Sequence, residues 1–165
     1  MGREFKLSAG NTPASLRYWH GDIFESGSDA LVNPVNCVGV MGAGLALCFK
    51  QRYPDAFASY RYACASGQLL PGLVHVAPKT ASRRFDIVHL PTKVHWREAA
   101  SLNLIERGLQ ALAEEAKDRG YTSISLPRLG CGLGRLLWAD VQPRIIEFAQ
   151  QVPDVEVRVC TPSAK

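Results

Sequence analysis

Two short glycine-rich stretches of this sequence have the composition of phosphate-binding loops. The first, within NPVNCVGVMGAGLALCFK (33–50), has three glycines in six residues, and the second, RLGCGLGRL (128–136), has three in five. Glycine has no Cβ, so backbone N–H groups can approach a ligand closely, and a helix that follows adds unpaired donors at its N-terminus. Two such loops side by side would form a trough for a diphosphate with a nucleoside at each end. The glycines are Gly39, Gly42, Gly44, Gly130, Gly132 and Gly134.

The usual nucleotide-binding motifs are not found around these glycines. The chain has no GxxxxGK[ST] sequence, which argues against a P-loop nucleotidase. A dinucleotide fingerprint counted from Gly42 and Gly44 would need glycine at position 47, where the chain has Leu47, so a hydride-transfer enzyme is disfavoured. Tight turns also use glycine, so a purely structural role remains the alternative for each loop.

Three polar residues near the first loop could recognise the rest of a nucleotide. The amides of Asn33 and Asn36 can donate to and accept from ribose hydroxyls, or they can make turns around Pro34. Ribose contact is favoured for Asn36, and the two interpretations are even for Asn33. Asp22, in HGDIF, can accept from an adenine amino group or can cap a turn.

The composition is that of an ordinary globular protein, with 47% hydrophobic and 21% charged residues and a net charge of +4. No apolar run reaches the roughly 20 residues of a membrane span, and the first residues, MGREFKLSAGN, do not resemble a secretory signal. A basic stripe typical of DNA-binding domains is missing. The one basic cluster, KTASRR (79–84), is expected to be a solvated turn, with a phosphate-backbone contact as the alternative.

Five cysteines and no CxxC pair argue against a zinc site, and we expect no metal. An odd number of cysteines without an export signal indicates reduced thiols in a cytoplasm. Cys37 and Cys131 lie in candidate loops and could be nucleophiles, but small buried thiols are the favoured interpretation for all five.

Strand-like and helix-like segments alternate along most of the chain, with two adjacent strands in the middle. Strands are predicted at 15–19, 29–34, 72–78, 84–91, 123–127 and 155–160, and helices at 42–53, 55–66, 98–119 and 139–151. The 98–119 helix has the clearest apolar stripe and ends at Gly120, whereas Pro143 is tolerable only near the first turn of the last helix. This order predicts an α/β fold, a three-layer α/β/α domain with a mixed central sheet. Residues 1–14 are expected to form a loose lead-in and residues 15–165 a single domain.

Four segments together resemble the macrodomain family. They are GDIF (21–24), ALVNPVNCVGVMGAGLALCFK (30–50), LPTKVHW (90–96) and PRLGCGLGRLLW (127–138), in family order across nearly the whole domain. Within the family, the chain is similar to members that hydrolyse terminal ADP-ribose from acidic side chains, and to bacterial antitoxins that remove ADP-ribose from thymidine in DNA.

The resemblance implies a role for each motif. Asp22 would contact adenine, with the Ile23 backbone nearby, Asn36 would bind the distal ribose, and the two glycine loops would hold the diphosphate. The expected ADP-ribose contacts are Asp22, Ile23, Asn33, Asn36, Gly39, Val40, Met41, Gly42, Gly44, Leu129, Gly130, Cys131, Gly132, Leu133 and Gly134.

The resemblance also implies that Lys93, in PTKVHW, is the catalytic residue. Its amine could attack the anomeric carbon, or position the breaking bond, if it is partly deprotonated, and partial burial and nearby cations lower a lysine pKa. The other interpretation of Lys93 is a surface lysine at the start of a loop.

One position departs from the branch that acts on acidic side chains. That branch has an aspartate after GCGL, where this chain has Gly134. The expected function is therefore an ADP-ribosyl hydrolase acting on modified protein carboxylates or DNA, with a non-catalytic ADP-ribose reader as the alternative. We expect no cofactor, no membrane association, a cytoplasmic location and a monomer.

Overall fold

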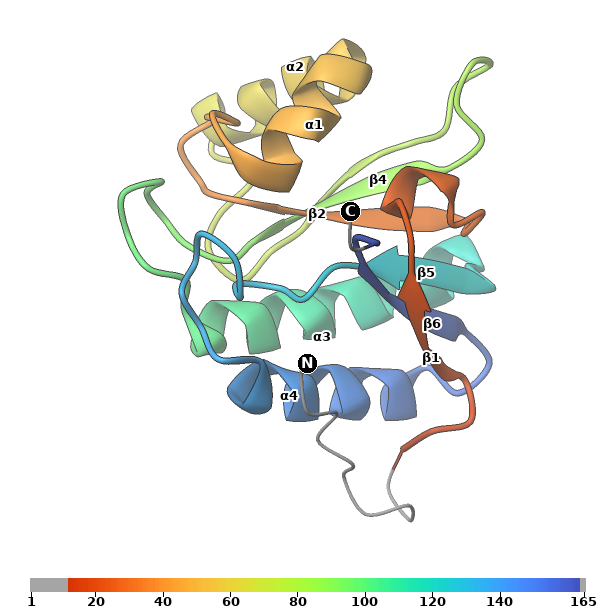
Figure 1. The fold of residues 1–165 in the computed structure, drawn as a ribbon. Helices are drawn as coiled ribbons and strands as arrows, with labels where there is room; N and C mark the ends of the chain where they lie inside the picture. The colour runs from red at the N-terminus through yellow and green to blue at the C-terminus, as the bar shows by residue number, and fades with distance from the viewer. Residues whose placement is uncertain (1–11, 164–165) are drawn as a thin grey trace.

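The computed structural model describes residues 12–163 and contains one six-stranded sheet (Figure 1). Its strand order is β1-β6-β5-β2-β4-β3, and only β3 runs antiparallel to its neighbour. The prediction of a mixed sheet is thus confirmed. The strands are β1 (Leu16–His20), β2 (Ala30–Val35), β3 (His75–Ala77), β4 (Asp86–Pro91), β5 (Ser123–Leu126) and β6 (Glu156–Thr161).

Helices cover both faces of the sheet and confirm the three-layer prediction. In Figure 1, α1 and α2 lie on one face and α3 and α4 on the other. The main apolar core lies between the sheet and α3 and α4, and two smaller clusters lie beneath α1 and α2. The helices are α1 (Gly44–Arg52), α2 (Pro54–Ala65), α3 (Leu102–Arg119) and α4 (Trp138–Gln151), and the sequence analysis missed the 3-10 turn η1 (Ile23–Glu25).

Helix α3 starts four residues later than predicted. The Ser101 hydroxyl accepts a hydrogen bond from Leu104 N at 3.3 Å and so caps the helix, while Ser101 N donates to Thr92 O at 2.8 Å. Residues 98–101 therefore lie outside the helix, because Glu98 closes a turn with His95 and Ser101 is extended and bonded to the segment that follows β4. Gly120 ends the helix in a left-handed conformation with a φ of 68°, as predicted.

Two further predictions were wrong in detail. Pro143 is the sixth residue of α4, beyond its first turn, where it leaves the Ala139 carbonyl without the usual N–H partner. Arg83, predicted to be part of a solvated turn, is 4% exposed and donates to three backbone carbonyls and to Asp55. It is a buried anchor for the β3–β4 turn and is not available to a phosphate backbone.

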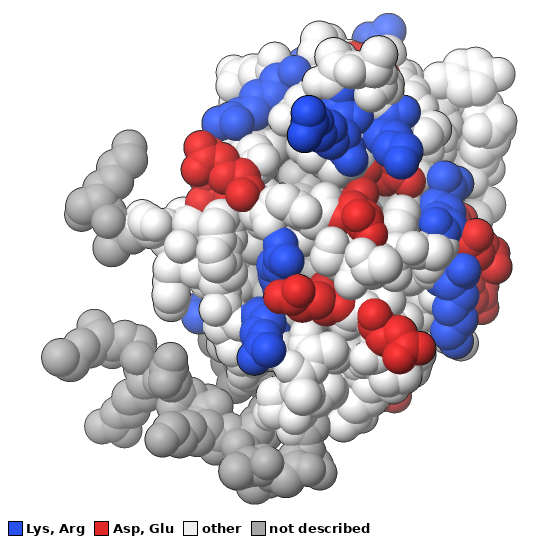
Figure 2. All heavy atoms as spheres, turned by 90° about the vertical axis from the view of Figure 1, so that its right-hand side faces the viewer, with Lys and Arg blue, Asp and Glu red and all other residues white. Residues whose placement is uncertain are grey.

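The predicted lead-in, residues 1–14, lies largely outside the described residues, and the extent of the domain remains a prediction. No helix among residues 12–163 is long and apolar enough to cross a membrane. On the face shown in Figure 2, basic and acidic side chains are interspersed.

We predict that Gly108→Ala destabilises the protein although alanine is the better helix former. A Cβ at Gly108 would lie 2.8 Å from Cγ and Cδ2 of Leu90, which is fully buried on β4 and cannot move aside. Overpacking of this kind destabilises a protein by about 1–3 kcal/mol. This exceeds the roughly 1 kcal/mol by which alanine stabilises a helix relative to glycine. Chemical denaturation measures the change in unfolding free energy.

The Leu90→Ala background provides the control, because it removes the clashing atoms. There, Gly108→Ala should be neutral or stabilising. Destabilisation of equal size in both backgrounds would contradict the packing argument.

Candidate functional site

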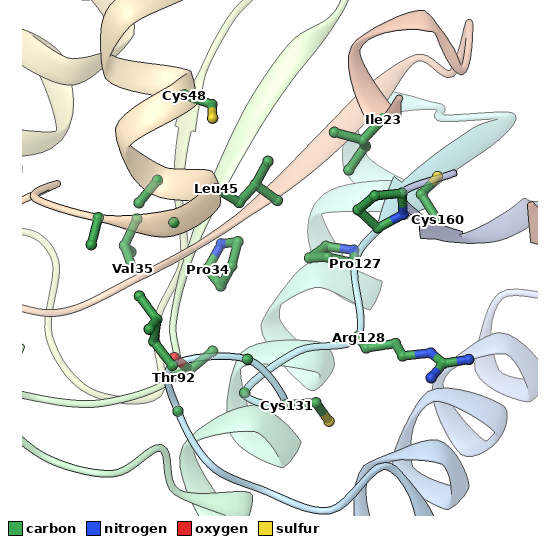
Figure 3. A pocket seen from close by; sticks show the side chains of 18 of the residues that line it. Ile23, Pro34, Val35, Leu45, Cys48, Thr92, Pro127, Arg128, Cys131 and Cys160 are labelled. Atoms are coloured by element: carbon green, nitrogen blue, oxygen red, sulfur yellow. The ribbon is translucent and has the colours of Figure 1, made fainter. Parts of the chain in front are cut away.

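A cleft of about 2000 Å³ opens at the carboxyl ends of the parallel strands. Figure 3 shows its walls, with Pro34 and Val35 from β2, Leu45 and Cys48 from α1, and Arg128 and Cys131 from the loop after β5. Ligands of α/β proteins bind at this edge of the sheet, where strands lead into helices. Both glycine loops line the cleft. They therefore lie close together at the same edge of the sheet, as the sequence analysis predicted.

The segment 92–101 connects the two glycine loops through backbone hydrogen bonds. On one side, Thr92 N donates to Val35 O and Cys37 N donates to Val94 O, both at 2.9 Å. On the other side, Ala100 N donates to Gly134 O at 2.9 Å. The segment that carries Lys93 is therefore tied to each of the loops.

Lys93 lies where its amine can reach the cleft. The residue lines the cleft and is half-buried. Among residues 12–163 its side chain has no ion-pair or hydrogen-bond partner. An amine without a partner beside two glycine loops is free to interact with a bound molecule.

Asn36 organises the first glycine loop. Its Oδ1 accepts from Val38 N at 3.1 Å and Val40 N at 3.4 Å, and its Nδ2 donates to Val40 O at 2.8 Å. The fully buried Tyr60 hydroxyl lies 2.7 Å from Asn36 Oδ1 and 2.9 Å from Asn36 O, to which it donates. The amide therefore closes a turn over residues 36–40, and not the expected turn around Pro34. It also lines the cleft, where the second Nδ2 hydrogen is left for a ligand.

The structure does not support Asn33 as a ligand contact. Asn33 is fully buried within β2, and its Nδ2 lies 3.2 Å from His89 Nδ1 and 3.8 Å from Met41 Sδ. Its side chain does not line the cleft, and no turn forms around Pro34 because both residues continue the strand. Within the described part of the chain its Oδ1 has no hydrogen-bond partner.

The other predicted residues divide into those that line the cleft and those that do not. Met41 and Leu129 are buried core residues, and Gly39 packs against Arg61 and Cys64 with a φ of 82°. None of these three lines the cleft, so their part in the site stays a prediction that depends on their backbone groups. The predicted residues that do line the cleft are Asp22, Ile23, Asn36, Val40, Gly42, Gly44, Lys93, Gly130, Cys131, Gly132, Leu133 and Gly134.

Asp22 has two protein partners at its end of the cleft. It caps η1, with Phe24 N donating to Oδ1 at 2.9 Å, and it pairs with Arg52, whose Nη2 lies 3.4 Å from Oδ2. Capping, the second interpretation of this residue, is thus present. The carboxylate remains partly exposed, at 38%, so it can also accept from a ligand.

Trp96, Arg97 and Glu98 line the cleft but were not proposed as site residues. They follow Lys93 in a turn in which Glu98 N donates to His95 O at 3.0 Å. The signal in the sequence was an aromatic and a cationic residue, three and four positions after the candidate lysine.

The loop geometry explains why position 134 has no side chain. A Cβ on Gly134 would lie 2.6 Å from Gly130 O and 2.7 Å from Ala100 Cβ. The same glycine accepts the hydrogen bond from Ala100 N, so it cannot move away without loosening the segment 92–101. An aspartate does not fit at this position of this loop.

The two cysteines considered as nucleophiles, Cys37 and Cys131, are poorly suited to that role. Burial raises the pKa of Cys37 to about 11, with smaller contributions from Cys64 and Glu98, and burial also raises the pKa of Cys131. All five cysteines are free, but of these only Cys160 is buried as predicted. Cys48 is exposed on α1, and Cys37, Cys64 and Cys131 are partly buried. Burial therefore disfavours the thiolate form of Cys37 and Cys131, the two cysteines considered as nucleophiles.

We predict that Gly134→Ala lowers thermal stability far more than Gly132→Ala. The Cβ at position 134 meets backbone, whereas a Cβ at Gly132 meets nothing within 4 Å, so the two variants are matched within one loop. The expected loss for Gly134→Ala is about 1–3 kcal/mol, against less than about 0.5 kcal/mol for the control. Equal unfolding free energies for the two variants would show that the loop accepts a side chain at position 134.

We further predict that His89 makes stability fall in acid. Complete burial, with a smaller contribution from the charge of the neighbouring His75, lowers the pKa of His89 to about 3. The unfolded chain, with a histidine pKa near 6.5, therefore binds more protons than the folded protein between about pH 6.5 and pH 3, and unfolding becomes easier as pH falls through this range.

The expected loss from His89 between pH 6.5 and 4.5 is about 2 kcal/mol. The measurement is the unfolding free energy against pH for the wild type and for His89→Gln, since His75 and the carboxylates titrate in both proteins. The wild type should have the steeper slope. Parallel slopes would mean that His89 binds a proton as readily in the folded protein as in the unfolded chain.

Comparison with known proteins agrees with this geometry. A family model for the Macro domain matches residues 32–145. The DNA ADP-ribosyl glycohydrolase of Mycobacterium tuberculosis is 40% identical over 152 residues, which are 90% of this chain and 42% of that protein. The protein of the same name from Thermus aquaticus is 41% identical over 149 residues, which are 89% of this chain and 41% of that protein. The chain thus spans less than half of the length of these relatives.

Solved structures give the same result. The macrodomain of Mycobacterium tuberculosis DarG superposes with a TM-score of 0.85 at 40% identity, over 90% of this chain and 98% of that one. Thermosipho africanus DarTG in complex with ADP-ribose superposes with a TM-score of 0.83 at 32% identity, over 88% of this chain and 41% of that one. With its sheet order, its paired glycine loops and these matches, the chain belongs to the macrodomain family.

Proposed function

We propose that this chain is an ADP-ribosyl hydrolase, which binds ADP-ribose and releases it from a modified macromolecule. The observation that carries the proposal is the free amine of Lys93 in a cleft bounded by two glycine loops. The names of similar proteins support it, since those from Mycobacterium tuberculosis and Thermus aquaticus are DNA ADP-ribosyl glycohydrolases. A human relative, 29% identical over 147 residues, is an ADP-ribose glycohydrolase.

In this proposal ADP-ribose lies along the cleft with adenine near Asp22 and Ile23 and the diphosphate between the glycine loops. The N–H groups of both loops would donate to the phosphate oxygens, and the N-terminus of α1, which begins at Gly44, adds partial positive charge. Asn36 would offer its remaining Nδ2 hydrogen to the distal ribose. The anomeric carbon would then lie at the Lys93 end of the cleft.

Lys93 is the proposed catalytic residue. The bond from the anomeric carbon to the macromolecule breaks, the oxygen of water forms the new bond to that carbon, and a proton from water passes to the leaving group. Charge develops on the ribose as the bond breaks. An amine held beside it can attack the carbon in its neutral form or can orient the leaving group.

The missing carboxylate at position 134 affects the choice of substrate. General acid–base assistance is worth roughly two to four orders of magnitude in rate, and the acidic residues that line the cleft are Asp22, Glu25 and Glu98. Without an aspartate at position 134, a substrate that carries its own good leaving group is favoured. ADP-ribose on DNA and ADP-ribose on a protein carboxylate are the two proposed substrates, and the names of the bacterial relatives favour DNA.

An ADP-ribose reader without activity is the second candidate. The reason is that Gly134 stands where the branch acting on acidic side chains has an aspartate that works with the lysine. We also propose a cytoplasmic monomer. The five free thiols suit a reducing compartment.

We predict that Lys93→Ala retains ADP-ribose binding within about three-fold and loses at least about 100-fold in turnover of an ADP-ribosylated oligonucleotide or an ADP-ribosylated protein. Lys79→Ala, an exposed lysine outside the cleft, is the matched control and should keep both. Calorimetry measures binding, and release of labelled ADP-ribose measures turnover.

Gly42→Val tests the binding site itself. The Cβ at Gly42 has only Val40 Cγ1 nearby, at 3.7 Å, so the fold tolerates it while its methyl groups enter the cleft. Affinity for ADP-ribose should fall by about ten-fold or more. Binding by the wild type without turnover of either substrate would favour the reader, and full activity of Lys93→Ala would remove the catalytic assignment.

A further inference from the structure

The turn 95–98 presents an indole ring at the mouth of the cleft. Trp96 is 48% exposed although it is a residue type that folding usually buries. The guanidinium carbon of Arg97 lies 4.7 Å from the centre of its ring, and the His95 ring centre lies 5.2 Å away. About half of the tryptophan surface thus remains open after both neighbours have packed against it.

This ring is attached to a firmly held segment close to Lys93. Trp96 is three residues beyond Lys93, both residues line the cleft, and the segment 92–101 is tied by backbone hydrogen bonds to both glycine loops. Arg97 N also donates to His95 Nδ1 at 3.1 Å, which closes the turn. A macromolecule attached to the anomeric carbon would extend out of the cleft along the segment 92–101. The shape of this segment is set before binding.

The charges around Trp96 favour an anionic chain. Arg97 and Arg135 both line the cleft and are exposed, and within residues 12–163 neither pairs with a carboxylate. The turn 95–98 also contains one acidic residue, Glu98, next to Arg97. A guanidinium that stacks on an aromatic face keeps its N–H edges free for phosphate oxygens.

We propose that Trp96 is a specificity-determining residue that stacks on the nucleobase to which ADP-ribose is attached, while Arg97 contacts the adjoining phosphate. This inference rests on the proposed function. Every base has a flat π-face, and the combination of an exposed aromatic ring with unpaired cations is how proteins hold single-stranded nucleic acid. The aliphatic side chain of an ADP-ribosylated glutamate has no such face to stack, so Trp96 should matter little for a protein substrate.

The test measures binding in the Lys93→Ala background, where the ligand is not consumed. Three ligands are compared: free ADP-ribose, a short single-stranded oligonucleotide carrying ADP-ribose on one base, and a peptide carrying ADP-ribose on glutamate. The modified oligonucleotide should bind about ten-fold or more tighter than free ADP-ribose. Adding Trp96→Ala should remove most of that advantage and leave the affinities for free ADP-ribose and for the peptide unchanged.

Two controls make the result specific. Trp96→Phe should keep part of the advantage, because a smaller ring still stacks. Tyr62→Ala removes an aromatic residue on α2 that is 67% exposed and does not line the cleft, and it should change none of the affinities. Arg97→Ala should weaken oligonucleotide binding less at high salt than at low salt, since a phosphate contact is screened.

Two results would overturn the proposal. One is an oligonucleotide that binds no tighter than free ADP-ribose when Trp96 is intact. The other is a Trp96→Ala variant that loses affinity equally for all three ligands, which would make Trp96 a part of the ADP-ribose site or of the fold. Failure of the proposed hydrolase function is detected separately, as a lack of turnover by the protein with Lys93 intact.

Discussion

Three backbone hydrogen bonds tie the segment 92–101 to its surroundings and hold the site together. Two join its first half to the end of β2 and the first glycine loop, and one joins Ala100 to Gly134 of the second loop. A further bond, from Ser101 N to Thr92 O, joins the two ends of the segment to each other. They are main-chain bonds, so they do not depend on the side chains that line the cleft. With them in place, Lys93 and Trp96 come from a segment whose position is set by both glycine loops.

The same bonds limit what the second glycine loop can contain. Gly134 must come close to both Gly130 O and Ala100 for its carbonyl to accept the bond from Ala100 N. A carboxylate at position 134 and the present attachment of the segment are therefore incompatible. In this protein the Ala100–Gly134 hydrogen bond is present and the carboxylate is not. The proposed chemistry therefore depends on Lys93 and on the leaving group of the substrate.

The first glycine loop is supported from below by polar groups that are costly to bury. Tyr60 and Asn36 bond to one another and to four backbone groups of the loop, so the cost of their burial is offset by hydrogen bonds. His89 and Asn33 continue this polar layer into the core, where burial keeps the imidazole neutral. Of these residues Asn36 lines the cleft, while Tyr60, His89 and Asn33 lie beneath the loop and support its backbone.

The sequence by itself determined the elements and the two glycine loops, because strand and helix patterns, the apolar stripe of α3 and the glycine-rich motifs are all local. It also singled out Lys93, through a resemblance rather than through a pattern. Only the tertiary structure decided which polar residues face the cleft. Asn33 is buried because β2 is a central strand beneath α2, and Arg83 is buried because Asp55 and three carbonyls surround it. Such burial depends on contacts between residues far apart in the chain, which no local pattern records.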